Sequence, residues 1–267
     1  MDSKRIAFVS VLGAALLAVA VDPALAQGYD STTEELIRTL NTQLLYAAIP
    51  ITVLVEGILI YTVWKFRNNE NPLPTKENRR LEITWTVATA IVLLFVGYAS
   101  YGVMANEYVT TTPEQAQNVE KNAVEIEVVA ERYAWTFNYK GQNVSASTNA
   151  VIPKNRPVYF NVTSKDWLHA FHVPQLGLKQ DAIPNQHNVI KTRATEEGTY
   201  QLYCAEYCGV GHSSMLGTVK VVNQSEYQQW LQNQPGYQGQ QSGGNNSSSA
   251  GNSSSGNGSS GGNNSSA

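Results

Sequence analysis

The sequence predicts a membrane anchor of two transmembrane α-helices, followed by an all-β domain outside the membrane. Two apolar stretches, at about residues 44–64 and 83–104, each have roughly the 20 residues that a helix needs to cross a bilayer. Beyond them, short runs of alternating apolar and polar residues recur between Gly, Pro and Asn residues, as in an antiparallel sandwich or barrel. From about residue 234 to residue 267 the chain is Gly, Ser, Asn and Gln and lacks apolar residues large enough to form a core, so we expect disorder there.

Composition narrows the class of protein only weakly. The 267 residues carry a net charge of −3, and 15% of them are charged. One domain of ordinary size plus appendages would account for this length, and the charge says little about partners. We expect no nucleic-acid partner.

The first 26 residues have the layout of a secretory signal peptide. Lys4 and Arg5 precede an apolar run at residues 6–21, and the Ala-Leu-Ala triplet at 24–26 provides a cleavage site before Gln27. The alternative is a first membrane helix. No Cys follows the apolar run, which excludes a lipoprotein anchor.

Residues 27–106 are predicted to form the anchor. Ser31, Thr32 and Glu34 have the spacing of a capping box, which predicts a short amphipathic helix at the outer surface before the first span. The loop between the spans is basic, which places it in the cytoplasm; its basic residues are Lys65, Arg67, Lys76, Arg79 and Arg80. Both ends of the hairpin, and the chain beyond residue 106, are therefore expected outside.

Two carboxylates lie in or beside the predicted spans. Glu56 is in the middle of the first span, where an ionisable group is costly and normally faces protein or water, so it indicates a membrane partner. Two roles for the Glu56 carboxyl stay open: a hydrogen bond to a neighbouring subunit, or a position in a proton path. Glu82 stands at the cytoplasmic start of the second span, where a carboxylate also complements the helix dipole.

Residues 107–233 are predicted to form the β-domain. The alternation of apolar and polar residues is clearest at residues 124–128, 158–162, 188–190, 199–203 and 219–221. Residues 226–231 predict a short terminal helix.

One loop of the β-domain, residues 204–215, carries most of the chemistry. Cys204, Cys208, His212 and Met215 put two thiols, an imidazole and a thioether within twelve residues, and these are the only two cysteines of the chain. Such soft donors are typical of copper electron-transfer sites. A disulfide is the common alternative for two cysteines in an exported protein. Zinc is disfavoured by the methionine, and the absence of a Cys-x-x-Cys-His motif excludes a covalent c-type haem.

Two metal ions that shared both thiolates would need a second imidazole. We choose His169, in the segment 164–174 that also contains His172. Each copper would then have two bridging sulfur atoms and one imidazole, with Met215 and a backbone carbonyl near Glu206 as weak axial donors.

The segment around His169, the residues 176–184 (LGLKQDAIP) and the 204–215 loop resemble subunit II of the haem–copper cytochrome c oxidases. The resemblance covers roughly residues 40–233. It implies a cupredoxin-like Greek-key barrel with a dinuclear copper (CuA) site, in which His169, directly after Leu168, is the ligand rather than His172. It also implies that the Glu206 carboxylate binds Mg at the interface with subunit I, that Asp181 belongs to this interface, and that Glu82 lies near the mouth of a proton channel.

The resemblance extends to the aromatic segment at residues 132–139. In the family this segment includes a surface Trp where the electron donor docks, two residues before another Trp. Trp135 matches the second position, but Tyr133 stands at the docking position. The donor is therefore open between cytochrome c and a small blue copper protein, and Tyr133 can also be a plain strand aromatic.

The resemblance implies an oxidoreductase subunit in the plasma membrane that takes electrons from the donor. It would pass them to the haem–copper centre of subunit I, with subunit III as a further partner, for oxygen reduction coupled to proton pumping. No catalytic residue is expected in this chain itself. Two alternatives stay open: the CuA subunit of a nitric oxide reductase and a membrane-tethered copper carrier. A quinol-oxidase subunit would lack the ligands, so the intact ligand set argues against it.

Overall fold

The computed structural model describes residues 28–74 and 76–238. The predicted signal peptide lies outside the described residues, and so does the predicted disordered tail from residue 239 onward. The first residues of that tail, 234–238, pack on the β-domain: the Asn143 side chain donates to the Gly236 carbonyl, and Tyr237 contacts the core.

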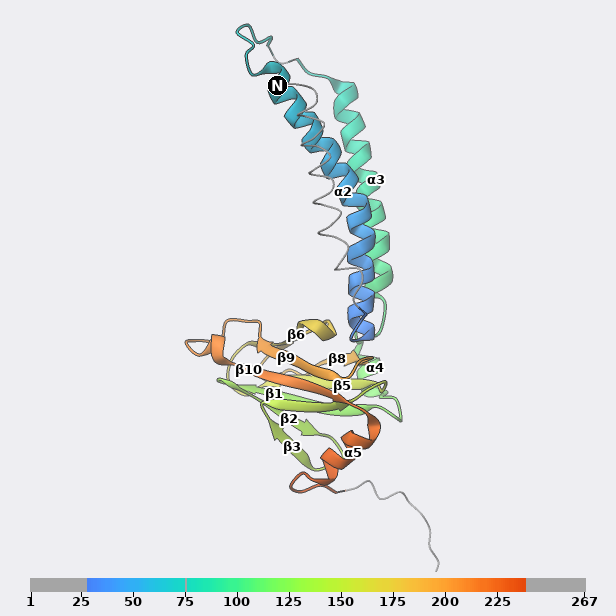
Figure 1. Ribbon diagram of the computed structural model, residues 1–267, viewed down its shortest axis with the longest axis vertical. Helices are drawn as coiled ribbons and strands as arrows, with labels where there is room; N and C mark the ends of the chain where they lie inside the picture. The colour runs from blue at the N-terminus through green and yellow to red at the C-terminus, as the bar shows by residue number, and fades with distance from the viewer. Residues whose placement is uncertain (1–27, 75, 239–267) are drawn as a thin grey trace, which may run out of the picture.

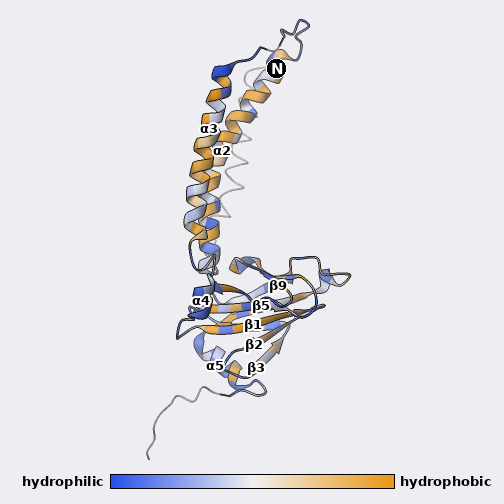
Figure 2. Ribbon diagram, turned by 180° about the vertical axis from the view of Figure 1, so that it is seen from behind, coloured by the Kyte–Doolittle hydropathy of each residue, from blue (hydrophilic) through white to orange (hydrophobic). Residues whose placement is uncertain are grey.

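Two long helices, α2 (Thr32–Phe66) and α3 (Arg79–Met104), stand side by side on one end of the β-domain (Figure 1). Both are long and apolar enough to cross a membrane, and they contain the two predicted spans. Figure 2 shows that hydrophobic residues run along both helices, and most of their large apolar side chains are exposed. Such a surface suits contact with lipid or with a membrane partner, because exposure of a large apolar surface to water is unfavourable.

The start of α2 differs from the prediction in two respects. The Glu34 amide donates to the Ser31 hydroxyl as in a capping box, but the Glu34 carboxylate accepts from the Asp30 amide and not from the cap residue itself. The expected short surface helix is also not separate, because α2 continues unbroken through Pro50 to Phe66. No glycine or proline interrupts residues 32–49, so nothing in the sequence ends the helix there.

The β-domain consists of two five-stranded sheets. The first has the order β3-β2-β1-β5-β8 and the second the order β4-β10-β9-β6-β7. The strands are β1 (Val124–Glu131), β2 (Ala134–Tyr139), β3 (Val144–Ser147), β4 (Asn149–Pro153), β5 (Val158–Ser164), β6 (His169–Val173), β7 (Leu178–Ala182), β8 (Asn188–Thr192), β9 (Gly198–Cys204) and β10 (Leu216–Val222). This confirms the predicted all-β sandwich. The pairing is mixed, however, since β1 pairs with β5 and β4 with β10 in parallel.

The core lies between the sheets because the strands alternate as predicted. On β1, Ile126, Val128 and Ala130 are fully buried, whereas Glu125 and Glu127 are on the opposite face. Four aromatic side chains meet in this core: the ring of Phe171 lies edge-on to Trp135 and Phe137 and is tilted against Phe160. Such edge-to-face packing is favourable for aromatic rings.

Short helices close the ends of the sandwich. α4 (Pro113–Gln117) lies in the connector between α3 and β1, and η1 (Pro174–Leu176) follows β6. η2 (His212–Ser214) lies between β9 and β10. The terminal helix α5 (Gln224–Gln232) buries Tyr227 and Leu231.

Candidate metal centre

Hydrogen-bonded strands bring the two predicted ligand segments together at one end of the sandwich. His169 begins β6 and Cys204 ends β9, and these strands are antiparallel neighbours. The Ala205 amide donates to the Ala170 carbonyl at 3.0 Å, and the Cys204 amide to the Met215 carbonyl at 3.1 Å. The site therefore stands on paired backbone rather than on a free loop.

The two thiols are free and adjacent. Cys204 and Cys208 form no disulfide, and their Sγ atoms lie 3.9 Å apart. The Cys204 Sγ atom is 3.8 Å from His169 Nδ1, and the Cys208 Sγ atom is 3.6 Å from His212 Nδ1. Each thiol thus lies beside an imidazole, and a ring nitrogen of His169 and the two sulfur atoms all lie within 4.8 Å of one another.

Each thiol also has one weak donor beside it. The Glu206 carbonyl oxygen lies 3.1 Å from Cys204 Sγ, and the Met215 Sδ atom lies 3.9 Å from Cys208 Sγ. Together these groups form one cluster of two thiols, two imidazoles, a carbonyl oxygen and a thioether.

The donor set fits copper. Cys204, Cys208, Met215 and His169 are buried, and bonds of about 2.3 Å, the length of zinc–thiolate bonds, let one ion touch both sulfur atoms. Burial and the neighbouring Cys204 raise the pKa of the Cys208 thiol to about 11. Two buried thiolates therefore need a cation to stabilise them, and thiolate with imidazole and thioether selects copper.

Asp166 orients His169, and the sequence analysis missed it. Its Oδ1 atom lies 2.9 Å from His169 Nε2, so the other ring nitrogen, Nδ1, faces the thiols. Burial raises the pKa of Asp166, but hydrogen bonds from His169 and from the amides of Arg132 and Trp167 outweigh it and lower that pKa. A carboxylate behind a metal-bound imidazole fixes its tautomer and direction.

His172 lies away from the thiols. It is three residues after His169 on the same strand, so its side chain is on the opposite face. Its Nδ1 atom bonds the Leu178 carbonyl at 2.7 Å, and its ring lies against Tyr203. These contacts agree with the choice of His169.

The aromatic segment lies directly against the centre. Trp135 is fully buried, with its ring edge-on to His169 at a centroid distance of 6.4 Å. The half-buried Tyr133 covers the loop between Cys208 and His212 at its two glycines. A Cβ at Gly209 would lie 2.7 Å from the Tyr133 hydroxyl, and one at Gly211 would overlap the ring. Only glycine allows this contact.

Of the remaining predicted residues, Glu206 reaches the centre through its carbonyl oxygen, and no contact of Asp181, Glu82 or Glu56 with the thiols is found among the described residues. Glu206 and Asp181 are exposed, and the Asp181 carbonyl accepts from the Asn188 side chain. Glu82 is in the first turn of α3, at the end of the hairpin far from the β-domain (Figure 1). Glu56 is exposed on α2.

Large exposed apolar side chains adjoin the residues of the centre in the sequence. We call these residues the apolar rim: Trp167, Leu168, Tyr207, Val210 and Leu216, with Val210 96% exposed. The Arg132 guanidinium lies over the Trp167 ring at 4.9 Å. Exposed apolar side chains of this kind are typical of a contact with another protein.

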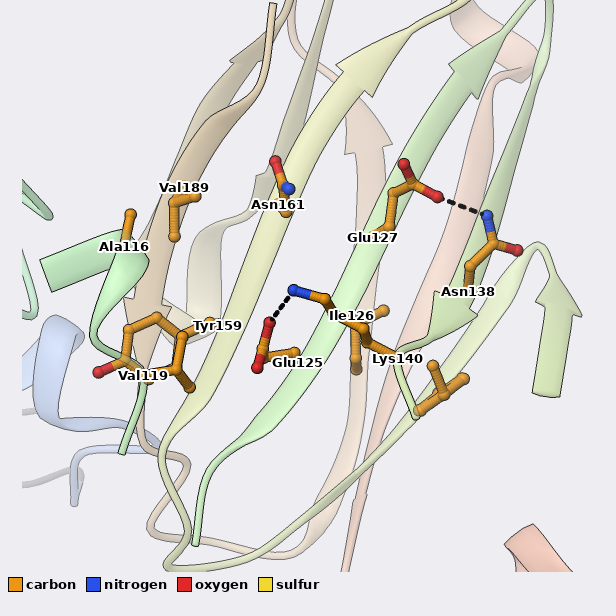
Figure 3. Close-up of a pocket in the computed structure, with 11 residues that line it drawn as sticks. Ala116, Val119, Glu125, Ile126, Glu127, Asn138, Lys140, Tyr159, Asn161 and Val189 are labelled. Carbon is orange, nitrogen blue, oxygen red and sulfur yellow. Dashed lines mark hydrogen bonds and ion pairs between the residues drawn. The ribbon is translucent and has the colours of Figure 1, made fainter. Parts of the chain in front are cut away.

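A hollow on the outer face of the first sheet, apart from the candidate metal centre, lacks the chemistry of a metal site (Figure 3). Its two carboxylates already have partners, since Glu125 pairs with Lys140 at 2.7 Å and Glu127 accepts from Asn138 at 2.9 Å. None of the predicted ligands lines it.

Fold and site together define a membrane-anchored, cupredoxin-like protein with a candidate copper centre of two thiols, two imidazoles and a thioether. Residues 25–103 match the family model of the cytochrome c oxidase subunit II transmembrane domain, and residues 138–222 match that of its periplasmic domain. The chain belongs to the cytochrome c oxidase subunit II family. It is thus a membrane-associated subunit of a terminal oxidase with an extracytoplasmic domain.

The chain is similar to individual proteins of known name. The chain is 29% identical over 211 residues to the probable cytochrome c oxidase subunit 2 of Rickettsia bellii, which covers 70% of this chain and 75% of the relative. It is 27% identical over 226 residues to cytochrome c oxidase subunit 2 of Cereibacter sphaeroides, and this match covers 70% of this chain and 72% of that relative. The crystal structure of the periplasmic domain of subunit II from Bradyrhizobium japonicum is 26% identical and covers 43% of this chain and 94% of that one, with a TM-score of 0.41.

Proposed function

We propose that this chain accepts electrons for a respiratory cytochrome c oxidase at a dinuclear copper site. The ligands would be His169, Cys204, the Glu206 carbonyl, Cys208, His212 and Met215. The observation that carries the proposal is the pair of free Sγ atoms 3.9 Å apart, each beside its own imidazole nitrogen. A single-copper site would not need this duplication.

The protein's part in electron transfer is to fix the positions of the metal ligands. Two copper ions held by these residues would supply a redox centre that takes up and releases one electron at a time. Cys204 and His169 are fixed by backbone hydrogen bonds between β6, β9 and the start of β10, and Asp166 holds the imidazole from behind. Ligands that do not move when the charge changes keep the reorganisation energy low, and burial of the sulfur atoms keeps water out.

We place the side where electrons enter at Tyr133 and Trp135. Tyr133 is half-buried and touches the ligand loop, and Trp135 lies edge-on to His169. The donor is cytochrome c or a small blue copper protein. It would dock on the apolar rim beside Tyr133, where exposed apolar side chains offer contact area.

The acceptor in this proposal is the haem–copper centre of subunit I, where oxygen is reduced and protons are pumped. The exposed Glu206 carboxylate would bind Mg at the interface with subunit I, and Asp181 would belong to the same interface. Glu82 would lie at the mouth of a proton channel of subunit I. Subunit III is a further partner, and the plasma membrane is the proposed location.

The test is a metal count and an EPR spectrum of the full-length chain loaded with copper. Two coppers per chain and a mixed-valence spectrum, with hyperfine structure from two equivalent nuclei, are expected. The Cys208→Ser variant should lose this spectrum, whereas His172→Gln, which alters an imidazole outside the centre, should keep it. One copper per chain with a single blue-copper spectrum, or a native disulfide, would contradict the proposal.

A further inference from the structure

Both ends of the membrane hairpin are attached to one short segment of the β-domain. This segment is residues 191–193, the end of β8 and the residue after it. β8 is an edge strand of the first sheet, on the side where the hairpin meets the domain (Figure 1). An edge strand has free backbone groups, which can pair with an added element.

The start of α2 is held by the second half of this segment. The Thr32 amide donates to the Arg193 carbonyl at 3.1 Å. The hydroxyls of Thr33 and Thr192, both buried, are hydrogen-bonded at 3.2 Å. The first turn of α2 is thus docked in the β-domain before the helix enters the membrane.

The connector that follows α3 is held by Lys191. This side chain is only 1% exposed, and its Nζ atom lies 2.9 Å from a Glu107 carboxylate oxygen and 2.5 Å from a Glu120 carboxylate oxygen. The rings of Tyr108 and Tyr159 cover the ammonium, with centroids 4.5 Å and 5.4 Å away. Glu107 and Tyr108 are the third and fourth residues after α3, while Glu120 lies four residues before β1.

The environment of Lys191 requires its charge. Burial lowers the pKa of this ammonium, but its hydrogen bonds to Glu120, Glu107 and Tyr159 outweigh burial and raise that pKa. A buried charge is retained only where such partners surround it, and aromatic faces attract a cation further. Its main-chain amide is also used, since it donates to the Thr111 hydroxyl at 3.2 Å.

We propose that Lys191 is a positioning residue that locks the connector, residues 105–123, to β8 and so fixes the orientation of the metal centre over the membrane. This inference rests on the proposed function. The start of α2 and the residues just before it are held by residues 192–195 and by η1. Release of the connector would leave these contacts as the pivot about which the domain could tilt. Electron tunnelling slows exponentially with distance, so a tilting domain would deliver electrons more slowly.

The test uses the assembled oxidase in oriented membrane multilayers. The copper EPR signal is recorded as the sample is rotated, which reports the direction of the centre relative to the membrane normal. Lys191→Met keeps the length of the side chain and removes its charge. Lys220→Met is the matched control, because Lys220 is also on a strand and pairs with a single carboxylate, Glu226, at 2.7 Å.

We expect Lys191→Met to keep the unoriented spectrum, to broaden its angular dependence, and to slow electron transfer from copper to haem several-fold. Reduction of copper by the donor should not change, and Lys220→Met should behave as wild type. The double variant Glu107→Gln/Glu120→Gln removes the same ion pairs from the connector side, outside the sandwich, and must show the same broadened angular dependence and slower electron transfer. If Lys191→Met fails to accumulate or alters the unoriented spectrum, this double variant becomes the deciding one. Wild-type angular dependence in the deciding variant overturns the inference.

Failure of the proposed function would give a different result. In that case the wild-type protein itself would lack a two-copper spectrum. Hydrogen exchange at residues 107–120 would still test the contact, since it needs no metal: faster exchange in Lys191→Met than in Lys220→Met is expected. Equal exchange in the two variants would overturn the role of Lys191.

Discussion

At the scale of single residues, the centre depends on side chains that touch the ligands without being ligands. Asp166 accepts from His169, and the ring of Tyr133 occupies the space left by Gly209 and Gly211. These contacts determine where an imidazole nitrogen points and how the ligand loop is folded. Two predictions follow from them at this scale.

The first concerns the carboxylate behind His169. Asp166→Ala removes the acceptor at 2.9 Å and leaves the imidazole free to rotate. Loss of such a partner lowers metal affinity about 10–100-fold, which we expect in a competition between the full-length chain and a copper chelator. Asp181→Ala, at an exposed carboxylate on β7, should leave the affinity of the isolated chain unchanged. Equal affinities in both variants would contradict the orienting role.

The second concerns the glycine under Tyr133. A methyl group at Gly211 would overlap the ring, so Gly211→Ala should destabilise the domain by about 1–3 kcal/mol, as overpacking does. Denaturant unfolding of the metal-free chain measures this change. In a protein that already carries Tyr133→Ala, the further change Gly211→Ala should cost much less stability than it does in the wild type. A loss of the same size in both backgrounds would show that the ring is not the cause.

At the scale of elements, α2 is part of the β-domain at its start and of the membrane anchor in its middle. Ser31 shows the connection, because its hydroxyl accepts from the Glu34 amide and donates to the Leu176 carbonyl at 2.7 Å. Gly177 lies against the same turn, at a φ of 65° and with the Glu34 backbone in the place of a side chain. The helix is therefore fixed by its cap and by close backbone packing.

Removal of this cap should loosen the junction. Ser31→Ala loses both hydrogen bonds at a fully buried position, and loss of a cap alone costs about 1 kcal/mol. Hydrogen exchange of the amides at residues 32–36 should become faster. Asn78→Ala removes the equivalent cap of α3 at an exposed position and should affect only the start of α3. No change at residues 32–36 would mean that the cap does not secure this contact.

Sequence alone predicted the elements better than the contacts between them. The two spans and the β-sandwich depend on local patterns, which one chain displays. The choice of His169 beside the 204–215 loop, by contrast, depended on the resemblance to a known family, because the two segments are far apart in the sequence. The docking of α2 on β8 and the parallel pairing of β1 with β5 join segments far apart in the sequence. The only sign of the role of Asp166 in the sequence is weak: it is a carboxylate three residues before His169. Nothing in the sequence indicates that Tyr133 contacts Gly211.

At the scale of the whole molecule, the protein has an apolar hairpin at one end and the apolar rim in its β-domain. Both surfaces are exposed in the isolated chain. Such surfaces are stable only when other molecules cover them. The chain is accordingly built as a component of a complex rather than as a free copper protein.

The rim provides a prediction for the complex. Val210→Ser shortens the most exposed rim side chain, which lies between the two glycines under Tyr133. We expect a KM for the electron donor raised several-fold with kcat and the copper spectrum unchanged, since truncation of an interface residue costs about 1 kcal/mol. Leu73→Ser, at a residue 90% exposed between the two helices, is the control. An unchanged KM would remove Val210 from the docking surface.

Five of the six proposed donors, from Cys204 to Met215, belong to twelve consecutive residues between two adjacent strands. The sixth, His169, starts the strand hydrogen-bonded to the first of them. The centre is therefore a compact insert that requires three things of its host: a neighbouring strand with a histidine in register, a carboxylate behind that histidine as Asp166 is here, and an aromatic ring over the two glycines as Tyr133 is here. A two-sheet scaffold that offers these contacts could accept the segment without the hairpin and its attachment at β8.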